Sequence, residues 1–126
     1  MIIGIVDTTI LIHLSRGNTA AAAWLKAQGN LGITSISWLE LIYGAQSKKH
    51  QSLALSLLQN FETIHLIQQD QTWAMRQLLN QRLSAGVAVN DCLIASIAYR
   101  LQLPLFTHNT KDLQKLLPTS LVIQPY

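Results

Sequence analysis

The chain has 126 residues and a mass of 14.0 kDa, and 49% of its residues are hydrophobic while 12% are charged. This length fits one folded domain over residues 1–126, and the composition excludes intrinsic disorder, which requires few apolar residues and many charges. The single cysteine, Cys92, excludes an intrachain disulfide and a thiolate zinc site, and because no signal peptide or membrane span is recognisable we expect a cytoplasmic protein.

Short apolar runs alternate with helical patterns along the chain. In chain order we expect a strand at 2–6, helices at 10–14 and 20–27, a strand at 31–34, helices at 35–45 and 53–61, a strand at 63–67, helices at 68–85 and 91–103, a strand at 105–107, a helix at 112–117 and a strand at 121–123. This alternation predicts an α/β fold with a mostly parallel sheet between two layers of helices.

The helix at 68–85 is the longest, and its spacing predicts an apolar stripe of Met75, Leu78, Leu79 and Leu83. A basic turn is expected at 48–50, just before the helix at 53–61. Glu62 and Asp70 have polar neighbours and are interpreted as surface acids.

The other four acids stand in apolar surroundings, which makes them candidates for function. They are Asp7, Glu40, Asp91 and Asp112. Each has a simpler explanation, since Asp7 and Asp91 could cap helices, Glu40 could form an ion pair, and Asp112 could be an exposed acid in a first helical turn.

The four acids are more informative together than singly. In a parallel sheet, ligands bind outside the carboxyl ends of the strands, and the end of the first strand and the segment after Thr107 meet there. Carboxylates that cluster repel one another unless cations neutralise them, and an acid-only site suits Mg²⁺ or Mn²⁺. If metal ions neutralise these four acids, the rest of the chain has nine basic residues and two acids. This excess of positive charge would attract the phosphate backbone of a nucleic acid.

Four motifs in this order resemble the PIN domain, and specifically the VapC toxins of bacterial toxin–antitoxin pairs. They are IVDTTILI, ISWLELIYGA, VNDCLIASIAYRLQLPLFT and THNTKDL, and together they span nearly the whole chain. The resemblance implies a PIN-like, Rossmann-like fold with three layers and a metal-dependent endoribonuclease.

Carried over residue by residue, the resemblance implies that Asp7, Glu40 and Asp91 hold one Mg²⁺ or Mn²⁺. Asp112 or Asn109 would assist a second ion, because the position that is often Asp in relatives is Asn109 here. Thr8 and Thr107 would support the acids. Residues that could contact RNA are Lys48, Lys49, Arg82, His108 and Lys111.

The implied partners are an RNA substrate, which could be transfer, ribosomal or messenger RNA, a VapB-type antitoxin, and a second copy in a homodimer. A non-catalytic PIN-like module that binds protein is the alternative, favoured by the apolar helix residues Trp38, Leu41, Ile42 and Tyr43. A haloacid-dehalogenase-type phosphatase is set aside, because Thr9 stands where that chemistry needs a second Asp. A receiver domain is set aside because no acidic pair precedes Asp7.

Overall fold

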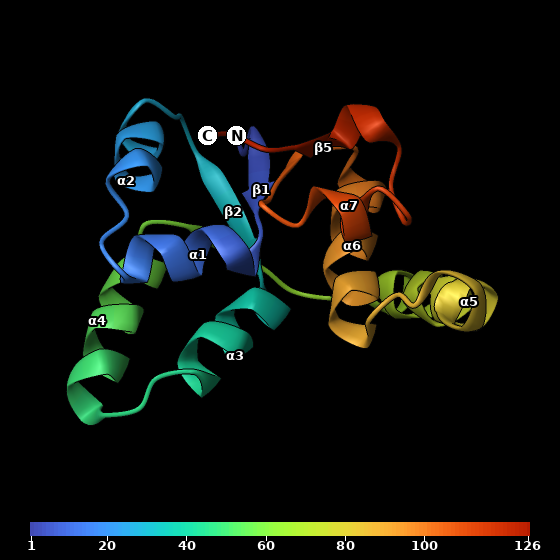
Figure 1. Ribbon diagram of the computed structural model, residues 1–126, viewed down its shortest axis with the longest axis horizontal. Helices are drawn as coiled ribbons and strands as arrows, with labels where there is room; N and C mark the ends of the chain where they lie inside the picture. The colour runs from blue at the N-terminus through green and yellow to red at the C-terminus, as the bar shows by residue number, and fades with distance from the viewer.

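A computed structural model describes residues 1–126 and shows a five-stranded parallel sheet in the order β3-β2-β1-β4-β5 (Figure 1). The strands are β1 Gly4–Val6, β2 Leu31–Thr34, β3 Glu62–Ile64, β4 Leu105–Phe106 and β5 Val122–Ile123. The helices are α1 Thr8–Ser15, α2 Thr19–Lys26, α3 Ser35–Tyr43, α4 Lys48–Leu58, α5 Gln68–Ala85, α6 Val89–Leu101, α7 Thr110–Leu113 and the 3₁₀ helix η1 Thr119–Leu121. The predicted three-layer α/β fold is confirmed. None of the helices combines the length and apolarity that crossing a membrane requires.

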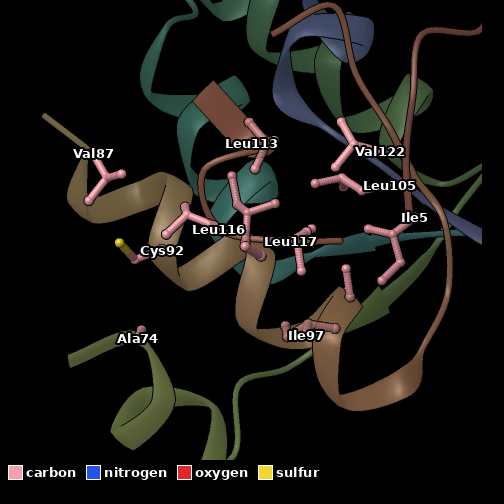
Figure 2. Packing of buried hydrophobic residues seen from close by; sticks show 13 residues of the cluster. Ile5, Ala74, Val87, Cys92, Ile97, Leu105, Leu113, Leu116, Leu117 and Val122 are labelled. Carbon is pink, nitrogen blue, oxygen red and sulfur yellow. The ribbon is translucent and has the colours of Figure 1, made fainter. Parts of the chain in front are cut away.

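The two faces of the sheet carry separate cores, because successive side chains of a strand point to opposite faces. Ile5 and Leu105 pack against α5, α6 and α7 (Figure 2), whereas their neighbours Val6 and Phe106 pack against α1 to α4. Figure 1 shows the same division, with α1 to α4 on one side of the sheet and α5 to α7 on the other. Both helix layers are therefore fixed to the central strands.

The order of the strands reverses at β1. The chain runs outward from β1 to β2 and β3, and then crosses back so that β4 pairs with the free edge of β1. In open parallel sheets such a reversal leaves a crevice at the carboxyl ends of the two strands concerned, where ligands bind. This rule directs attention to the residues that follow β1 and those that follow β4.

Gly4 and Phe106 are in close contact where β1 pairs with β4. A Cβ atom on Gly4 would overlap the Phe106 ring as it is placed, so a larger residue would require the ring to move. The register of the two strands sets Ile5 beside Leu105 and Val6 beside Phe106. The next residues along the two strands, Asp7 and Thr107, consequently lie side by side.

Two expectations about helices were wrong. The residues predicted to form a basic turn, Lys48 to His50, are the first turn of α4, because the Ser47 side chain accepts a hydrogen bond from the His50 backbone and starts the helix there. Of the predicted stripe of α5 only Leu78 packs against the core, since Met75, Leu79 and Leu83 are 65%, 84% and 100% exposed. Ala74 and the partly buried Trp73 complete the packed face of the helix.

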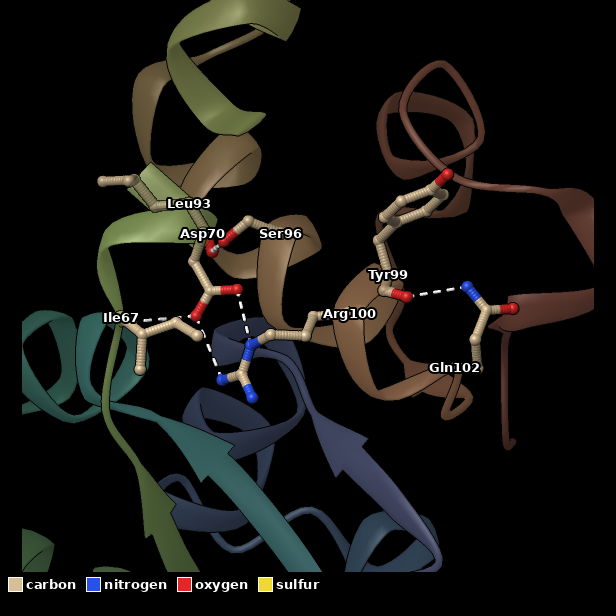
Figure 3. A network of polar contacts seen from close by, with 7 residues as sticks. All are labelled: Ile67, Asp70, Leu93, Ser96, Tyr99, Arg100 and Gln102. Atoms are coloured by element: carbon tan, nitrogen blue, oxygen red, sulfur yellow. Dashed lines mark hydrogen bonds and ion pairs between the residues drawn. The ribbon is translucent and has the colours of Figure 1, made fainter. Parts of the chain in front are cut away.

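The interpretation of Asp70 as a surface acid was also wrong. Its side chain is 1% exposed, and its two oxygens accept hydrogen bonds from Arg100 Nε at 2.7 Å and from the second guanidinium nitrogen at 3.0 Å (Figure 3). The same carboxylate accepts the Ile67 backbone N–H at 3.1 Å, at the start of α5. Asp70 therefore joins α5 to α6 and has a structural role.

Candidate functional site

Asp7 lies at the carboxyl end of β1 and is 3% exposed. Although it precedes α1, its side chain makes no capping hydrogen bond, so the simpler explanation fails. Oδ2 instead accepts hydrogen bonds from the Thr107 hydroxyl at 2.6 Å and the Thr9 hydroxyl at 3.1 Å. Burial raises the pKa of Asp7, and the Thr107 hydrogen bond opposes that rise.

Glu40 approaches from the helix that follows β2. Its Oε1 accepts the Thr8 hydroxyl at 2.6 Å and its Oε2 accepts the Asn90 amide at 3.1 Å. A hydroxyl has one hydrogen, and Thr8 gives it to the carboxylate, so the Ser37 hydroxyl, 2.8 Å away, donates to Thr8. Glu40 is thus tied to α1 and α6 by neutral donors and not by an ion pair.

Asp91 lies in the first turn of α6, where Ala88 and not Asp91 occupies the capping position. No hydrogen bond within the protein reaches its carboxylate, and the side chain is partly buried. Burial raises the pKa of Asp91 to about 6, and the charges of Asp7, Asp112 and Glu40 add to the rise. Four acids predicted from separate elements therefore share one electrostatic field.

Asp112 differs from the other three because it has a cation in contact. Lys115 Nζ lies 3.1 Å from Asp112 Oδ1, and this hydrogen bond holds the pKa of Asp112 below its usual range. The Asn109 side chain also favours the charged form of Asp112. Asn109 is anchored through its backbone N–H, which donates to the Thr107 hydroxyl at 2.9 Å. Both candidates for the fourth position thus stand at the same side of the site.

The acids meet at one edge of the sheet, but no three Asp, Glu, His or Cys side chains are arranged closely enough to hold a metal ion as they stand. This separation has a physical cause, because each carboxylate except Asp91 turns toward its own hydrogen-bond donor and like charges repel. The donor chemistry still fits a hard divalent cation, since the converging groups are carboxylate oxygens and Asp91 has no counter-ion.

The residues predicted to contact RNA are placed differently from one another. Lys48, Lys49 and Lys111 are exposed, and the Arg82 guanidinium donates to the carbonyls of Gly86 and Val87. The His108 ring is turned away from the acids.

The His108 ring packs against His13 and Tyr126, with ring centroids 4.8 and 4.4 Å away, and its Nε2 is buried without a hydrogen-bond partner. Burial lowers the pKa of His108, and the neighbouring His13 adds to this effect. Only its backbone touches the site, where its N–H donates to the Thr9 hydroxyl at 3.0 Å. His108 therefore supports the hydroxyl that reaches Asp7.

Four residues with a part in the site were not among the sequence candidates. They are Thr9, Ser37, Asn90 and Lys115. Two of them, Ser37 and Lys115, could have been found from their spacing to an acid. Ser37 is three residues before Glu40, and Lys115 is three residues after Asp112. Side chains three residues apart lie close together on a helix. Thr9 and Asn90 act across the fold, and no pattern along the chain shows their contacts.

Comparison with known proteins agrees with this geometry. The PIN domain family matches residues 4–116, which is most of the chain. No curated protein matches it.

Three solved structures are similar over nearly their whole length. A toxin–antitoxin complex from Klebsiella pneumoniae has a chain that is 28% identical, with a TM-score of 0.79 and 98% of each chain covered. VapBC2 from Rickettsia felis, bound to a DNA fragment from its promoter, is 25% identical with a TM-score of 0.80 and the same coverage. VapBC-1 from nontypeable Haemophilus influenzae is 25% identical, with a TM-score of 0.72 and 92% of each chain covered. The chain therefore belongs to the PIN domain family, and the resemblance to VapC-type PIN domains predicted from its sequence is confirmed.

Proposed function

We propose that this chain is a Mg²⁺- or Mn²⁺-dependent endoribonuclease and the toxin of a toxin–antitoxin pair, working as a single PIN domain over residues 1–126. The observation that carries the proposal is the convergence of Asp7, Glu40, Asp91 and Asp112 at the reversal of strand order, where their charges act on one another. Membership of the PIN domain family and the similarity to toxin–antitoxin complexes support it.

Asp7, Glu40 and Asp91 are the residues that would hold the metal ion, with Asp112 and Asn109 on the neighbouring side. A bound divalent ion would lower the pKa of the attacking water and would stabilise the negative charge that develops on the phosphodiester. The protein supplies negative charge without its own counter-ions, because Asp7 and Glu40 receive hydrogen bonds only from neutral groups.

The hydroxyl groups around the acids have a positioning role in this proposal. Thr107 and Thr9 hold one oxygen of Asp7 and leave Oδ1 free of side-chain hydrogen bonds. Thr8 and Asn90 fix the two oxygens of Glu40 and so set its direction. Hydroxyl donors orient a carboxylate while leaving its charge in place for a cation. RNA would be cut to leave a 5′-phosphate and a 3′-hydroxyl.

Protein partners are supported by apolar side chains that lie in solvent. Of the α3 residues predicted to favour protein binding only Tyr43 is exposed, at 92%, since Leu41 is buried and Trp38 and Ile42 pack against the core. Leu39 of the same helix is 57% exposed, and α5 exposes Leu79 and Leu83 almost fully. Exposed apolar side chains grouped on a helix are typical of protein–protein contacts. We infer a VapB-type antitoxin as one partner and a second copy of the chain as the other.

The test is cleavage of total cellular RNA by the purified chain with Mg²⁺, with Mn²⁺ and without added metal, followed by mapping of the new 5′ ends. Asp91→Asn removes the charge of an acid in the site, and Glu62→Gln removes an exposed charge on β3 as the matched control. We expect metal-dependent cuts at a few positions with wild type and Glu62→Gln, and none with Asp91→Asn.

The mapped ends would also show whether transfer, ribosomal or messenger RNA is the substrate. Equal cutting by Asp91→Asn and wild type would indicate a contaminant. No cutting by folded, metal-supplemented wild type would favour the non-catalytic, protein-binding module.

A further inference from the structure

Lys115 is the cation at the edge of the candidate site, and the structure holds it there with two acceptors. Its ammonium donates to Asp112 Oδ1 at 3.1 Å and to the backbone carbonyl of Ala85 at 2.9 Å. Ala85 is the last residue of α5, and carbonyls at the carboxyl end of a helix lack partners within the helix and carry partial negative charge. Lys115 therefore has a defined place between α5 and α7.

The neighbouring cation does not compete with Lys115 for this place. Arg82, the other cation at this turn, donates to the carbonyls of Gly86 and Val87 and leaves that of Ala85 to Lys115. The Lys115 side chain is 31% exposed, so it is partly withdrawn from water.

The contact divides the site into two unequal sides. Asp91 has no cation in contact and feels the charge of Lys115 only from a distance, and Asp7 and Glu40 accept hydrogen bonds only from neutral donors, so no cation contacts the acids of this side. On the other side the charge of Asp112 is balanced by Lys115, and Asn109 adds a neutral amide. The positive charge of the ammonium repels a metal ion that approaches the same carboxylate, so Lys115 should lower the affinity of Asp112 for a second ion.

We propose that Lys115 is a built-in cation at Asp112, so that the resting site takes one divalent ion, on the side of Asp7, Glu40 and Asp91, and no second ion at Asp112. The proposal rests on the metal-dependent function proposed above and assigns Lys115 a positioning role in it. A second ion would either replace the ammonium at Asp112 or bind the other carboxylate oxygen against the repulsion of the ammonium.

The test is the number of Mn²⁺ ions bound by the full chain in the absence of RNA, measured by electron paramagnetic resonance of free Mn²⁺ and by calorimetry. We expect one ion for wild type. Lys115→Gln removes the charge and should add a second ion, with affinity for that ion raised about tenfold, which corresponds to ~1.4 kcal/mol. Asp112→Asn in the Lys115→Gln background should remove the second ion again.

Two control variants distinguish the effect of the Lys115–Asp112 contact from that of any nearby positive charge. Lys115→Arg keeps the cation and should bind one ion, as wild type does. Lys111→Gln removes an exposed charge on the same helix, one residue from Asp112, and should also bind one ion. Circular dichroism establishes that each variant is folded before its ions are counted.

The outcomes that overturn the proposal are distinct from failure of the proposed function. Two ions in wild type, a single ion in folded Lys115→Gln, or a second ion gained equally by Lys111→Gln would each overturn the role of Lys115 while leaving a metal-dependent nuclease intact. Absence of any Mn²⁺ binding by wild type would overturn both.

Discussion

Replacing Asp91 with Asn should stabilise the metal-free protein at neutral pH. Asp91 is partly buried, receives no hydrogen bond within the protein, and lies in the field of Asp7, Asp112 and Glu40. Its negative charge therefore opposes folding when no cation is bound. Asn has nearly the same shape without the charge, so the substitution removes an unfavourable interaction and leaves the packing of α6 in place.

The magnitude follows from the pKa of Asp91, which is raised from 3.8 to about 6 in the folded protein. One pKa unit corresponds to ~1.4 kcal/mol, so the full effect is about 3 kcal/mol. Solvent and salt screen a partly exposed charge, and we expect a gain of roughly 1 to 2 kcal/mol in the free energy of unfolding. For a domain of this size that is a rise in Tm of about 4 to 8 °C.

The pH dependence of stability independently shows whether Asp91→Asn stabilises or destabilises the protein. Below pH 3.8 the carboxyl of Asp91 is protonated in both the folded and unfolded chain, so its charge contributes nothing. Between pH 3.8 and about 6 the folded protein retains a proton that the unfolded chain has lost, and the stability of wild type falls as the pH rises. The advantage of Asp91→Asn should therefore appear across this window and be complete above about pH 6.

The assay is urea unfolding of wild type and Asp91→Asn with chelator present, at several pH values from 4 to 7. Glu62→Gln, which neutralises an exposed acid, is the control and should show no comparable gain. Adding Mn²⁺ should stabilise wild type more than Asp91→Asn. The reasoning is refuted if Asp91→Asn is no more stable than wild type at pH 7, or if its advantage is the same at pH 4 and pH 7.

Three further predictions concern residues around the site. Asp70→Asn should lower the free energy of unfolding by about 3 kcal/mol, seen in urea unfolding, because it leaves the Arg100 charge without its buried partner; a neutral or stabilising effect would contradict this. Thr107→Val removes the hydroxyl that reaches Asp7 at 2.6 Å and should reduce RNA cleavage about tenfold, ~1.4 kcal/mol, whereas Thr63→Val on β3 should not; equal rates would exclude the positioning role. Tyr126→Phe removes the 2.7 Å hydrogen bond to His13 Nδ1 and should lower the free energy of unfolding, measured by thermal unfolding, by about 1 kcal/mol, while Mn²⁺ binding stays unchanged. A change in Mn²⁺ binding would show that the aromatic cluster of His13, His108 and Tyr126 affects the metal site.

The positions of the strands could be predicted because the local pattern determines them. The run at 31–34 forms β2 with the predicted bounds, and the helix predicted at 68–85 forms α5 with the predicted bounds. Short apolar runs of β-branched residues favour buried parallel strands wherever they occur. Which face of α5 is buried could not be predicted, because that depends on where α6 lies, and the contact with α6 places Ala74 in the core while Leu79 and Leu83 stay exposed.

The four acids could be selected from the sequence, but their surroundings could not. Thr107 and Asp7 are 100 residues apart, and Glu40 and Asn90 are 50 apart, so these contacts exist only after the sheet has formed. Lys115 is the exception, because it follows Asp112 by three residues on the same segment. The spacing alone would have suggested the ion pair.

Asp70 and Asp91 show why burial of an acid does not by itself identify a functional site. Asp70 is buried and Asp91 partly buried, and each lies in the first turn of its helix. Asp70 faces Arg100 in a two-point contact, so its charge is used within the fold and is not available to a ligand. Asp91 has no cation in contact, and burial and three neighbouring acids outweigh the more distant charge of Lys115, so folding raises the pKa of Asp91. Such an arrangement costs stability, and a bound divalent cation would offset that cost, so the absence of a cation in contact, more than the depth of burial, is the reason to propose Asp91 and not Asp70 as a metal ligand.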